Sequence, residues 1–312
     1  MAKKVVIAAS GRRCGGLPTL SPSMQTDAAV ISYLNLVTEN VADRHPDLIL
    51  FPEMADMPDG WSMDDYFAYI RRRGERVLRR AAEAAKQYHT WIAFCTIRKT
   101  AQGALRNSCL LFDRNGNQVF AFDKLHPTLG ELEQGVEPGD GLHCFDCELG
   151  RIAGMICFDA NDLGAALALA EQHPDCILFP ALFHGGLLQQ FWAVASGAYL
   201  ISACGGCGAG AVSPLGQVLV QSNLPDGETV ISIGLDYAVV HLDFNTEKLR
   251  KAAEKYRSFL IITPPDKMGA VLVTSVCAEK STAQILREFG IEPRDAYLRR
   301  AFECAACHGG TK

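Results

Sequence analysis

The chain has 312 residues, of which 48% are hydrophobic, so it is long enough for one large domain or two smaller ones. Its formal net charge is −5 and no basic block stands out, which gives no indication of a nucleic-acid partner. The most basic run, RRRGERVLRR at residues 71–80, has apolar residues between its arginines. That pattern favours the exposed face of a helix over a phosphate-binding patch.

The N-terminal residues MAKKVVIAASGRRCGG are not typical of a signal peptide, because the apolar stretch is short and charge follows it at once. No window approaches 18 apolar residues, so no membrane span is expected. The chain contains twelve cysteines. Without an export signal, these predict a reducing cytoplasmic location and mostly free thiols.

Short apolar runs rich in Val, Ile, Leu and Phe alternate with amphipathic stretches along the chain. Such runs are typical of buried strands, and amphipathic stretches of helices. Strands are predicted at residues 4–9, 47–51, 91–97, 107–113, 118–123, 151–157, 175–180 and 199–203. Helices are predicted at residues 62–89, 162–172, 186–197 and 246–257. Asn115-Gly116 between two strands indicates a hairpin, and the whole pattern predicts an α/β fold with a mixed sheet.

Two segments of the chain repeat each other. Residues 45–54 read HPDLILFPEM and residues 173–182 read HPDCILFPAL, which suggests two related halves packed together. Each copy has the pattern of a helix exit, a strand and a turn. Glu53 in the first copy corresponds to Ala181 in the second, so the turn does not require a glutamate. A chemical role for Glu53 is therefore favoured.

Three reactive side chains follow predicted strands: Glu53 after LILF, Lys124 after VFAF, and Cys157 at the end of IAGMI. In α/β sheets, binding and catalytic residues tend to lie just beyond the carboxyl ends of the strands. A thiol nucleophile, a carboxylate base and an ammonium that stabilises an oxyanion are sufficient for acyl transfer. The helix predicted after Cys157 is expected to favour its thiolate. Each residue alone could be structural, but together the three favour catalysis.

At this point the sequence resembles a known family. LILFPEM, FDKLHPTLGE and GMICFD are similar to the Glu, Lys and Cys motifs of the nitrilase superfamily, the carbon–nitrogen hydrolases. The resemblance implies an α-β-β-α sandwich that dimerises into a larger sandwich, with no metal or organic cofactor. It implies hydrolysis of a non-peptide C–N bond through a thioester, with Glu53 as base, Lys124 as the lysine and Cys157 as nucleophile. A supporting glutamate would be Glu131, with Glu133 as the competing candidate.

The chain also departs from the family pattern. Phe158, Asp159 and then ANDLG follow the cysteine, where the family often has an arginine, and AVASGAYLIS replaces an Arg-Ala-x-Glu-Asn segment. Phe158 and Asp159 are expected to support the site or bind substrate. His184, after the second repeat, is expected to border the site, although a structural role is nearly as plausible for it.

The likeness covers residues 4–265, so we expect a C–N hydrolase domain at 1–265 and an extension at 266–312 that covers a dimer or the pocket mouth. Within the extension, 270–276 predict a strand and 281–290 a helix. CAACH at 304–308 matches a haem-attachment pattern, but we expect a frayed tail or an adventitious metal site there.

Two cysteine pairs, at 144/147 and 204/207, have zinc-like spacing. HCFDCELG reads as a strand, which places its cysteines on opposite faces. A metal site is therefore not expected.

The expected function is hydrolysis of a small-molecule amide or carbamoyl compound. Nitrile hydrolysis by the same triad and a non-catalytic binding protein are the alternatives. KLHPTLGE and GDG resemble true nitrilases, whereas Phe158-Asp159 after the cysteine is more similar to amidases and carbamoyl hydrolases. The expected partners are a small-molecule substrate and a second copy of the chain, without nucleic acid or membrane.

Overall fold

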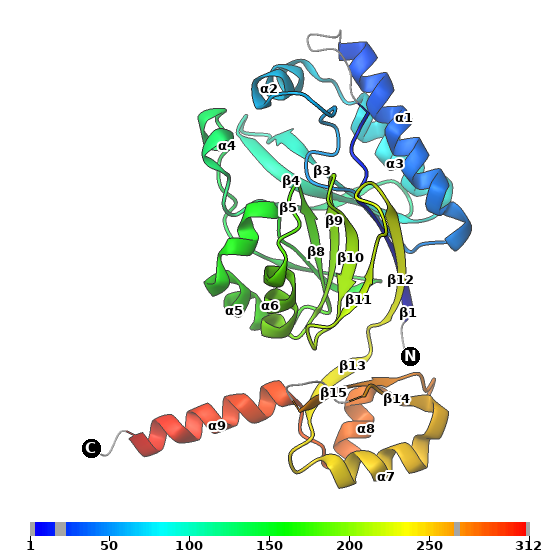
Figure 1. Cartoon of the computed structure of the whole chain (residues 1–312), viewed down its shortest axis with the longest axis vertical. Helices are drawn as coiled ribbons and strands as arrows, with labels where there is room; N and C mark the ends of the chain where they lie inside the picture. Colours follow the sequence, from blue (N-terminus) through cyan, green and yellow to red (C-terminus); the bar gives the residue numbers. More distant parts are fainter. Residues whose placement is uncertain (1–3, 16–22, 265–268, 310–312) are drawn as a thin grey trace. The chain divides into compact units, whose positions relative to one another are not determined.

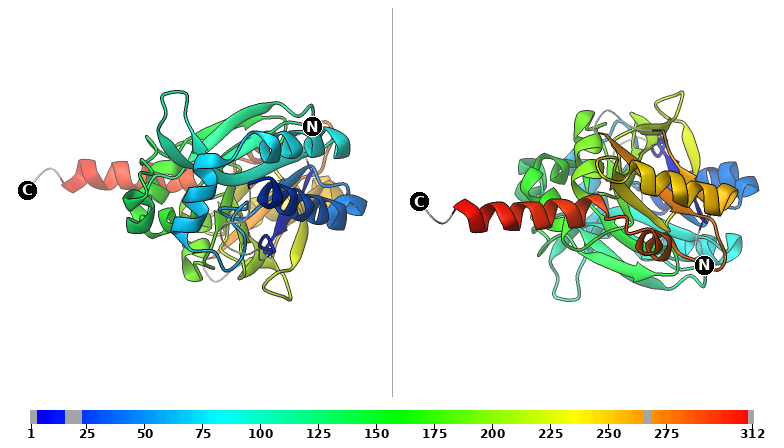
Figure 2. Two further views of the ribbon diagram at one scale, coloured as in Figure 1. Left: turned by 90° about the horizontal axis from the view of Figure 1, so that it is seen from above. Right: turned by 90° about the horizontal axis from the view of Figure 1, so that it is seen from below.

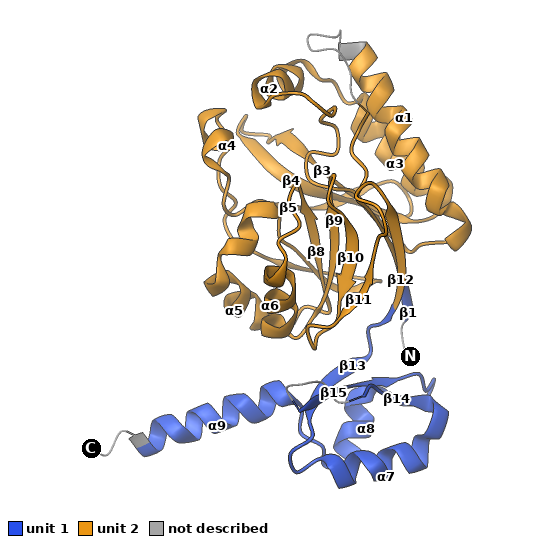
Figure 3. Cartoon of the chain, in the orientation of Figure 1, with its two compact units in different colours: residues 1–5, 233–312 blue, residues 6–232 orange. Residues whose placement is uncertain are grey.

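The computed structural model describes residues 4–15, 23–264 and 269–309. Contacts within it divide the chain into two compact units, drawn in different colours in Figure 3. The larger unit is Val6–Ser232, and the C-terminal unit consists of the described residues from Ile233 onward together with the start of the chain. The expected boundary at 265 concerned the extent of the family likeness, and it stays a prediction.

The first sheet of the fold has six strands in the order β12-β1-β2-β3-β4-β5 (Figure 1). These are β1 (Lys4–Ser10), β2 (Leu48–Leu50), β3 (Trp91–Lys99), β4 (Leu105–Phe112), β5 (Gln118–Asp123) and β12 (Glu228–Gly234). Strands β1, β2 and β3 run parallel, and β3, β4 and β5 run antiparallel. Helices α1 (Ser23–Val41) and α3 (Arg76–Tyr88) lie side by side and bury their apolar faces against this sheet (Figure 2).

The second sheet also has six strands, in the order β11-β10-β9-β8-β7-β6. They are β6 (Cys144–Cys147), β7 (Gly150–Gly154), β8 (Cys176–Ala181), β9 (Tyr199–Cys204), β10 (Gly208–Val212) and β11 (Val218–Gln221). Its central strands β7, β8 and β9 are parallel. Helices α5 (Leu163–Ala170) and α6 (Leu187–Ser196) pack on it through a core that includes Leu169 and Trp192.

The two sheets approach each other closely, with helices on their outer faces (Figure 1). A Cβ added to Gly154 in β7 would lie 2.5 Å from Cγ of Phe122 in β5. Only a residue without a side chain fits this contact between the sheets. The predicted α-β-β-α sandwich of two mixed sheets is confirmed.

The helix predicted over 62–89 is in fact two helices, α2 (Met63–Arg72) and α3. Ser62 caps α2 as expected, in a capping box with Asp65. The chain breaks at Arg73, which adopts an extended conformation before Gly74. The guanidinium of Arg73 is bound to the buried carboxylate of Asp56, and glycine is a poor helix former, so the continuous-helix prediction was wrong at this point.

The sequence repeat has a structural counterpart. His45 and His173 both lie at helix exits in the left-handed region, with φ of 47° and 52°. Each leads into a parallel strand of its sheet, β2 in the first and β8 in the second. The match therefore extends from sequence to backbone conformation. The predicted hairpin is present as well, since Gly116 joins the antiparallel strands β4 and β5 with a φ of 82°.

Other short helices were not anticipated. They are η1 (Ala42–Arg44), α4 (Leu129–Glu133), η2 (Cys157–Asn161) and η3 (Arg257–Phe259), and the long helix α1 was also missed. None of the helices described in the structure is both long and apolar enough to cross a membrane.

The C-terminal unit contains a three-stranded antiparallel sheet in the order β13-β15-β14. Its elements are β13 (Tyr237–His241), β14 (Leu260–Ile262), β15 (Ala270–Ser275), α7 (Thr246–Tyr256), α8 (Thr282–Glu288) and α9 (Arg294–Gly309). Ser281 caps α8 as expected. The CAACH segment lies within α9 with both cysteines exposed, so the expectation of a frayed tail was wrong for residues 304–308.

Candidate functional site

The structure brings Glu53, Lys124 and Cys157 together at the ends of three strands. Lys124 follows β5 directly, Glu53 lies three residues beyond β2, and Cys157 three residues beyond β7. Lys124 Nζ donates a hydrogen bond of 2.7 Å to Glu53 Oε1, and the Cys157 thiol lies close enough to Glu53 for that carboxylate to raise its pKa. Glu53 and Lys124 are 2% and 1% exposed. A thiol, a carboxylate and an ammonium therefore share one buried cluster.

Glu131 joins this cluster from α4. Its Oε2 accepts from Lys124 Nζ at 2.7 Å, and from the backbone N–H and hydroxyl of Thr128 at 2.8 and 2.9 Å. Thr128 is the N-cap of α4, so the capping box that starts this helix also orients the carboxylate. Glu133 lies on the same short helix and is exposed. Of the two glutamates left open by the sequence, the structure places Glu131 in the cluster.

Burial and charge compete in the electrostatics of this cluster. Burial alone would lower the pKa of Lys124, but the charges of Glu53 and Glu131 outweigh it, and the pKa is raised. Burial would raise the pKa of Glu131, but the Lys124 ammonium outweighs it, and that pKa is lowered. Lys124 and Glu131 are therefore both charged at neutral pH.

Cys157 occupies a turn and does not end a strand. β7 ends at Gly154, and Cys157 is the first residue of η2 with a φ of 49°, which is unusual for a residue with a side chain. This turn carries the thiol out of the sheet toward Glu53. Burial, and next the Glu53 charge, raise the pKa of Cys157, although Lys124 opposes this. The expectation that the following helix favours a thiolate was wrong, because η2 is a short 3₁₀ helix and the thiol is largely buried.

Asp159 connects the nucleophile turn to the loop that follows Lys124. Its carboxylate is 1% exposed and accepts from the N–H groups of Ile156 at 2.9 Å, His126 at 2.7 Å and Leu125 at 3.3 Å. Asp159 thus joins the backbone of these two segments, and its supporting role at the site stays a prediction. The neighbouring Phe158 is 48% exposed, and substrate binding by its ring stays a prediction.

Asn107 is a member of the cluster that sequence reasoning missed. It lies on β4, 1% exposed, and its Nδ2 donates to Glu53 Oε1 at 2.9 Å and to Glu131 Oε1 at 2.7 Å. Its backbone carbonyl accepts from the Lys124 N–H at 2.8 Å. The signal in the sequence is a single amide at the start of the apolar run NSCLLF, in a strand predicted to be buried.

The loop after Glu53 is held by a second buried network. Asp56 is fully buried and accepts from the hydroxyl of Tyr66 at 2.6 Å, from the hydroxyl of Thr96 and from the guanidinium of Arg73. Met54, between Glu53 and Asp56, has a φ of 47°. The Asp56 network therefore anchors a strained loop directly after the catalytic candidate.

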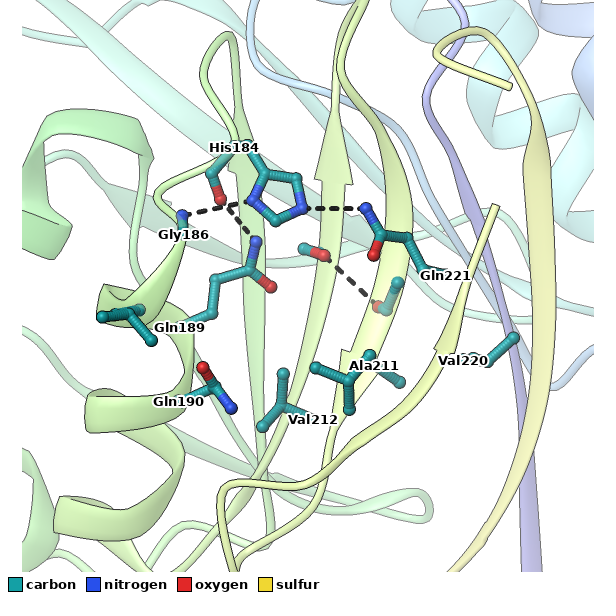
Figure 4. A pocket seen from close by; sticks show the side chains of 12 residues that line it. His184, Gly186, Gln189, Gln190, Ala211, Val212, Val220 and Gln221 are labelled. Atoms are coloured by element: carbon teal, nitrogen blue, oxygen red, sulfur yellow. Dashed lines mark hydrogen bonds between the residues drawn. The ribbon is translucent and has the colours of Figure 1, made fainter. Parts of the chain in front are cut away.

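His184 lines a separate cavity of about 290 Å³ between α6, the edge strand β11 and its neighbour β10 (Figure 4). The N–H of Gly186 donates to its Nδ1 at 3.2 Å, and its Nε2 lies 3.2 Å from the side-chain nitrogen of Gln221. Gln189, which also lines the cavity, donates to the His184 carbonyl oxygen. The expected position of His184 at the border of the substrate site stays a prediction.

All twelve cysteines have free thiols. Cys144 and Cys147 are the two ends of β6, as predicted for a strand, and Cys204 ends β9. Among the residues that the structure describes, no group of three or more His, Cys, Asp or Glu side chains is placed to hold a metal ion.

Comparisons with known proteins identify the family and the fold. The family model described as carbon–nitrogen hydrolase matches residues 16–243. The chain is 24% identical to the omega-amidase NIT2 of Homo sapiens over 238 residues, covering 68% of this chain and 81% of the relative. The structure of Nit3 from Saccharomyces cerevisiae, a member of branch 10 of the nitrilase superfamily, superposes with a TM-score of 0.61 and 18% identity, covering 82% and 96% of the two chains.

A second solved structure is that of an amidase from Nesterenkonia sp. AN1, with acrylamide added to its active-site cysteine. It superposes with a TM-score of 0.62 and 16% identity, covering 73% of this chain and 92% of the amidase. Both solved structures share the fold described above.

Proposed function

Because this chain belongs to the carbon–nitrogen hydrolases of the nitrilase superfamily, we propose that it hydrolyses a small amide or carbamoyl compound through a thioester on Cys157. The observation that carries this proposal is that one carboxylate, Glu53, binds the Lys124 ammonium and lies near enough to the Cys157 thiol to raise its pKa. The amidase names among the relatives support the choice of substrate class.

The first half of the reaction forms the thioester. The pKa of Cys157 is raised, so its proton is still on sulfur at neutral pH and passes to Glu53 as the sulfur attacks the carbonyl carbon. The oxyanion is stabilised by Lys124 Nζ and by the N–H of Phe158, in the first turn of η2 where backbone donors lack helical partners. The C–N bond then breaks, and the nitrogen leaves as ammonia or an amine with the proton from Glu53.

The second half of the reaction releases the acid. Glu53 takes a proton from water as the water oxygen attacks the thioester carbon, and Lys124 again stabilises the oxyanion. The C–S bond breaks, the proton returns from Glu53 to the sulfur, and a carboxylic acid is released. Glu131 keeps Lys124 charged and in place throughout, through the 2.7 Å bond to Nζ.

Nitrile hydrolysis by the same residues is the second candidate. The stretch KLHPTLGE, which carries Lys124 and Glu131, resembles true nitrilases. A nitrile must first form a thioimidate and then take up water, so it requires more of the pocket than an amide does. Phe158-Asp159 lies next to the nucleophile and favours the amide.

The test is a screen for liberated ammonia over amides, ureido acids and nitriles, followed by the Cys157→Ala variant. Turnover should vanish in Cys157→Ala while thermal unfolding stays close to that of the wild type. Intact-mass spectrometry of acid-quenched wild type should show an acyl adduct that this variant lacks. Cys109→Ala, which removes another buried thiol, is the matched control and should stay active. An active Cys157→Ala enzyme would contradict the proposal.

We also propose that the protein forms homodimers through the outer face of α5 and α6. Four large apolar side chains on these helices are well exposed: Leu163, Leu167, Leu187 and Phe191. Such a patch is typical of an interface, and the family resemblance favours a second copy as its partner. Light scattering after chromatography should show that Leu187→Glu weakens the dimer.

Twelve free thiols support a reducing compartment such as the cytoplasm.

A further inference from the structure

Two buried carboxylates share a single ammonium in the candidate site. Lys124 Nζ bonds to both Glu53 and Glu131, which leaves the group with a net charge of −1 when all three are ionised. Asn107 is the other side chain that donates to both glutamates, through the two N–H bonds of one amide. A neutral donor therefore compensates for part of the charge that the lysine leaves unpaired.

The orientation of the Asn107 amide is determined by its surroundings. Its Oδ1 lies 3.6 Å from Sγ of Cys95, on the neighbouring strand β3. Burial raises the pKa of Cys95 well above its usual range, so this thiol keeps its proton and donates a hydrogen bond to Oδ1. With the oxygen facing Cys95, the NH₂ group must face the carboxylates. The backbone of Asn107 also binds the Lys124 N–H at 2.8 Å, so one residue orients both sides of the ion pair.

The bonds to Glu53 are one-sided. Both Asn107 Nδ2 and Lys124 Nζ donate to Oε1, at 2.9 and 2.7 Å. With Oε1 held in this way, Oε2 is the oxygen left to receive the proton of Cys157. Loss of the amide would leave one anchor on Oε1, about which the carboxylate could turn.

We propose that Asn107 is a positioning residue of the candidate site, held by the Cys95 thiol, which aims Glu53 Oε2 at Cys157 and holds the two carboxylates beside each other through its two N–H groups. This inference rests on the proposed function for its effect on turnover. Its effect on the thiol is independent of any substrate, because proton transfer from Cys157 to Glu53 also governs how fast Cys157 reacts with an alkylating agent.

The decisive variant is Asn107→Leu, which replaces the amide by an apolar side chain of similar shape on β4 and removes both donors. The control is Cys109→Ala, two residues along the same strand and on the same face, which changes another fully buried side chain without touching either glutamate. Asn107→Asp is nearly isosteric and serves as the second variant in case Asn107→Leu does not fold. Cys95→Ala tests the orienting thiol.

Two quantities are measured as a function of pH in each variant. One is the rate at which iodoacetamide alkylates Cys157, resolved by peptide mass spectrometry. The other is kcat/KM for the best amide of the screen. Without the amide, the carboxylates are protonated more easily, so the acid limb of both profiles should move up by about one pH unit in Asn107→Leu. At neutral pH, kcat/KM should fall on the order of 100-fold, as expected for a misplaced catalytic group.

Asn107→Asp should shift the acid limb at least as far, because it adds a third carboxylate, and Cys95→Ala should shift it less in the same direction. Profiles that coincide with those of Cys109→Ala would overturn the inference, whichever of the variants folds. If the wild type hydrolyses no amide but the alkylation profile moves as expected, the proposed function fails and the positioning role stands. If the wild type hydrolyses an amide but the acid limb of neither profile moves in the variants, the proposed function stands and the positioning role fails.

Discussion

Replacing Lys124 by methionine tests the charge balance of the site most directly. Methionine keeps the length and most of the volume of lysine but removes the ammonium. In the folded protein that ammonium lies 2.7 Å from Glu53 and from Glu131, and all three side chains are at most 2% exposed. Lys124→Met therefore leaves two buried carboxylates side by side with Asn107 as a shared donor.

Removing one partner of a buried ion pair destabilises a protein by about 3–5 kcal/mol. In the wild type the pKa of Glu131 is held below its ordinary value of 4.5, so its contribution to stability is present above that pH and is lost as pH falls. In Lys124→Met the sign reverses. Without the ammonium, burial raises the carboxyl pKa above the unfolded value, so the variant should be most stable in acid and lose stability as pH rises.

The assay is urea denaturation of wild type and variant between about pH 5 and pH 8, with ammonia release measured at each pH. The gap in unfolding free energy should widen from pH 5 to pH 8, and turnover should fall by about 100-fold or more, as for other oxyanion donors. Lys86→Met, on the exposed side of α3, is the matched control and should change neither quantity. A gap that is the same at both pH values would refute the reasoning.

Three further predictions follow from the same geometry. Glu131→Gln should lower turnover by at least tenfold, whereas Glu133→Gln should stay near wild type; equal effects in an ammonia-release assay would remove Glu131 from the site. Arg73→Met should destabilise the protein by about 3–5 kcal/mol in urea denaturation, because it leaves the Asp56 carboxylate buried without its ion pair. For amide and nitrile forms of one acyl group, kcat/KM should favour the amide, and a tenfold preference for the nitrile, about 1.4 kcal/mol, would reverse the substrate assignment.

The sequence was most informative where it repeats itself. Glu53 differs from the corresponding Ala181 in the two HPD segments, and the structure places those segments at equivalent turns, with His45 and His173 both left-handed. The strand ends brought Lys124 and Cys157 to the same cluster as Glu53, as expected for α/β sheets. These groups could be found because strand ends are visible in the apolar pattern.

Features that depend on tertiary contacts were not visible in that pattern. Asn107 looks like an ordinary strand residue until β4 is placed beside the loop that carries Glu53. The helix break at Arg73 depends on its pairing with the buried Asp56, which local propensity does not report. Cys157 lies in a turn and has a positive φ. The sequence predicted a continuing strand there, because the residues MIC are apolar and directly follow β7.

The closeness of the two sheets has a consequence for how this enzyme could change over evolution. Phe122 lies two residues before Lys124, and Gly154 three residues before Cys157, so a change at 154 would act on both segments that carry these side chains. Because Gly154 has no side chain, β7 can approach Phe122 of β5 closely. A single added methyl group would collide with Phe122 and force β5 and β7 apart without altering Lys124 or Cys157. Position 154 is therefore expected to accept only glycine while surrounding residues vary.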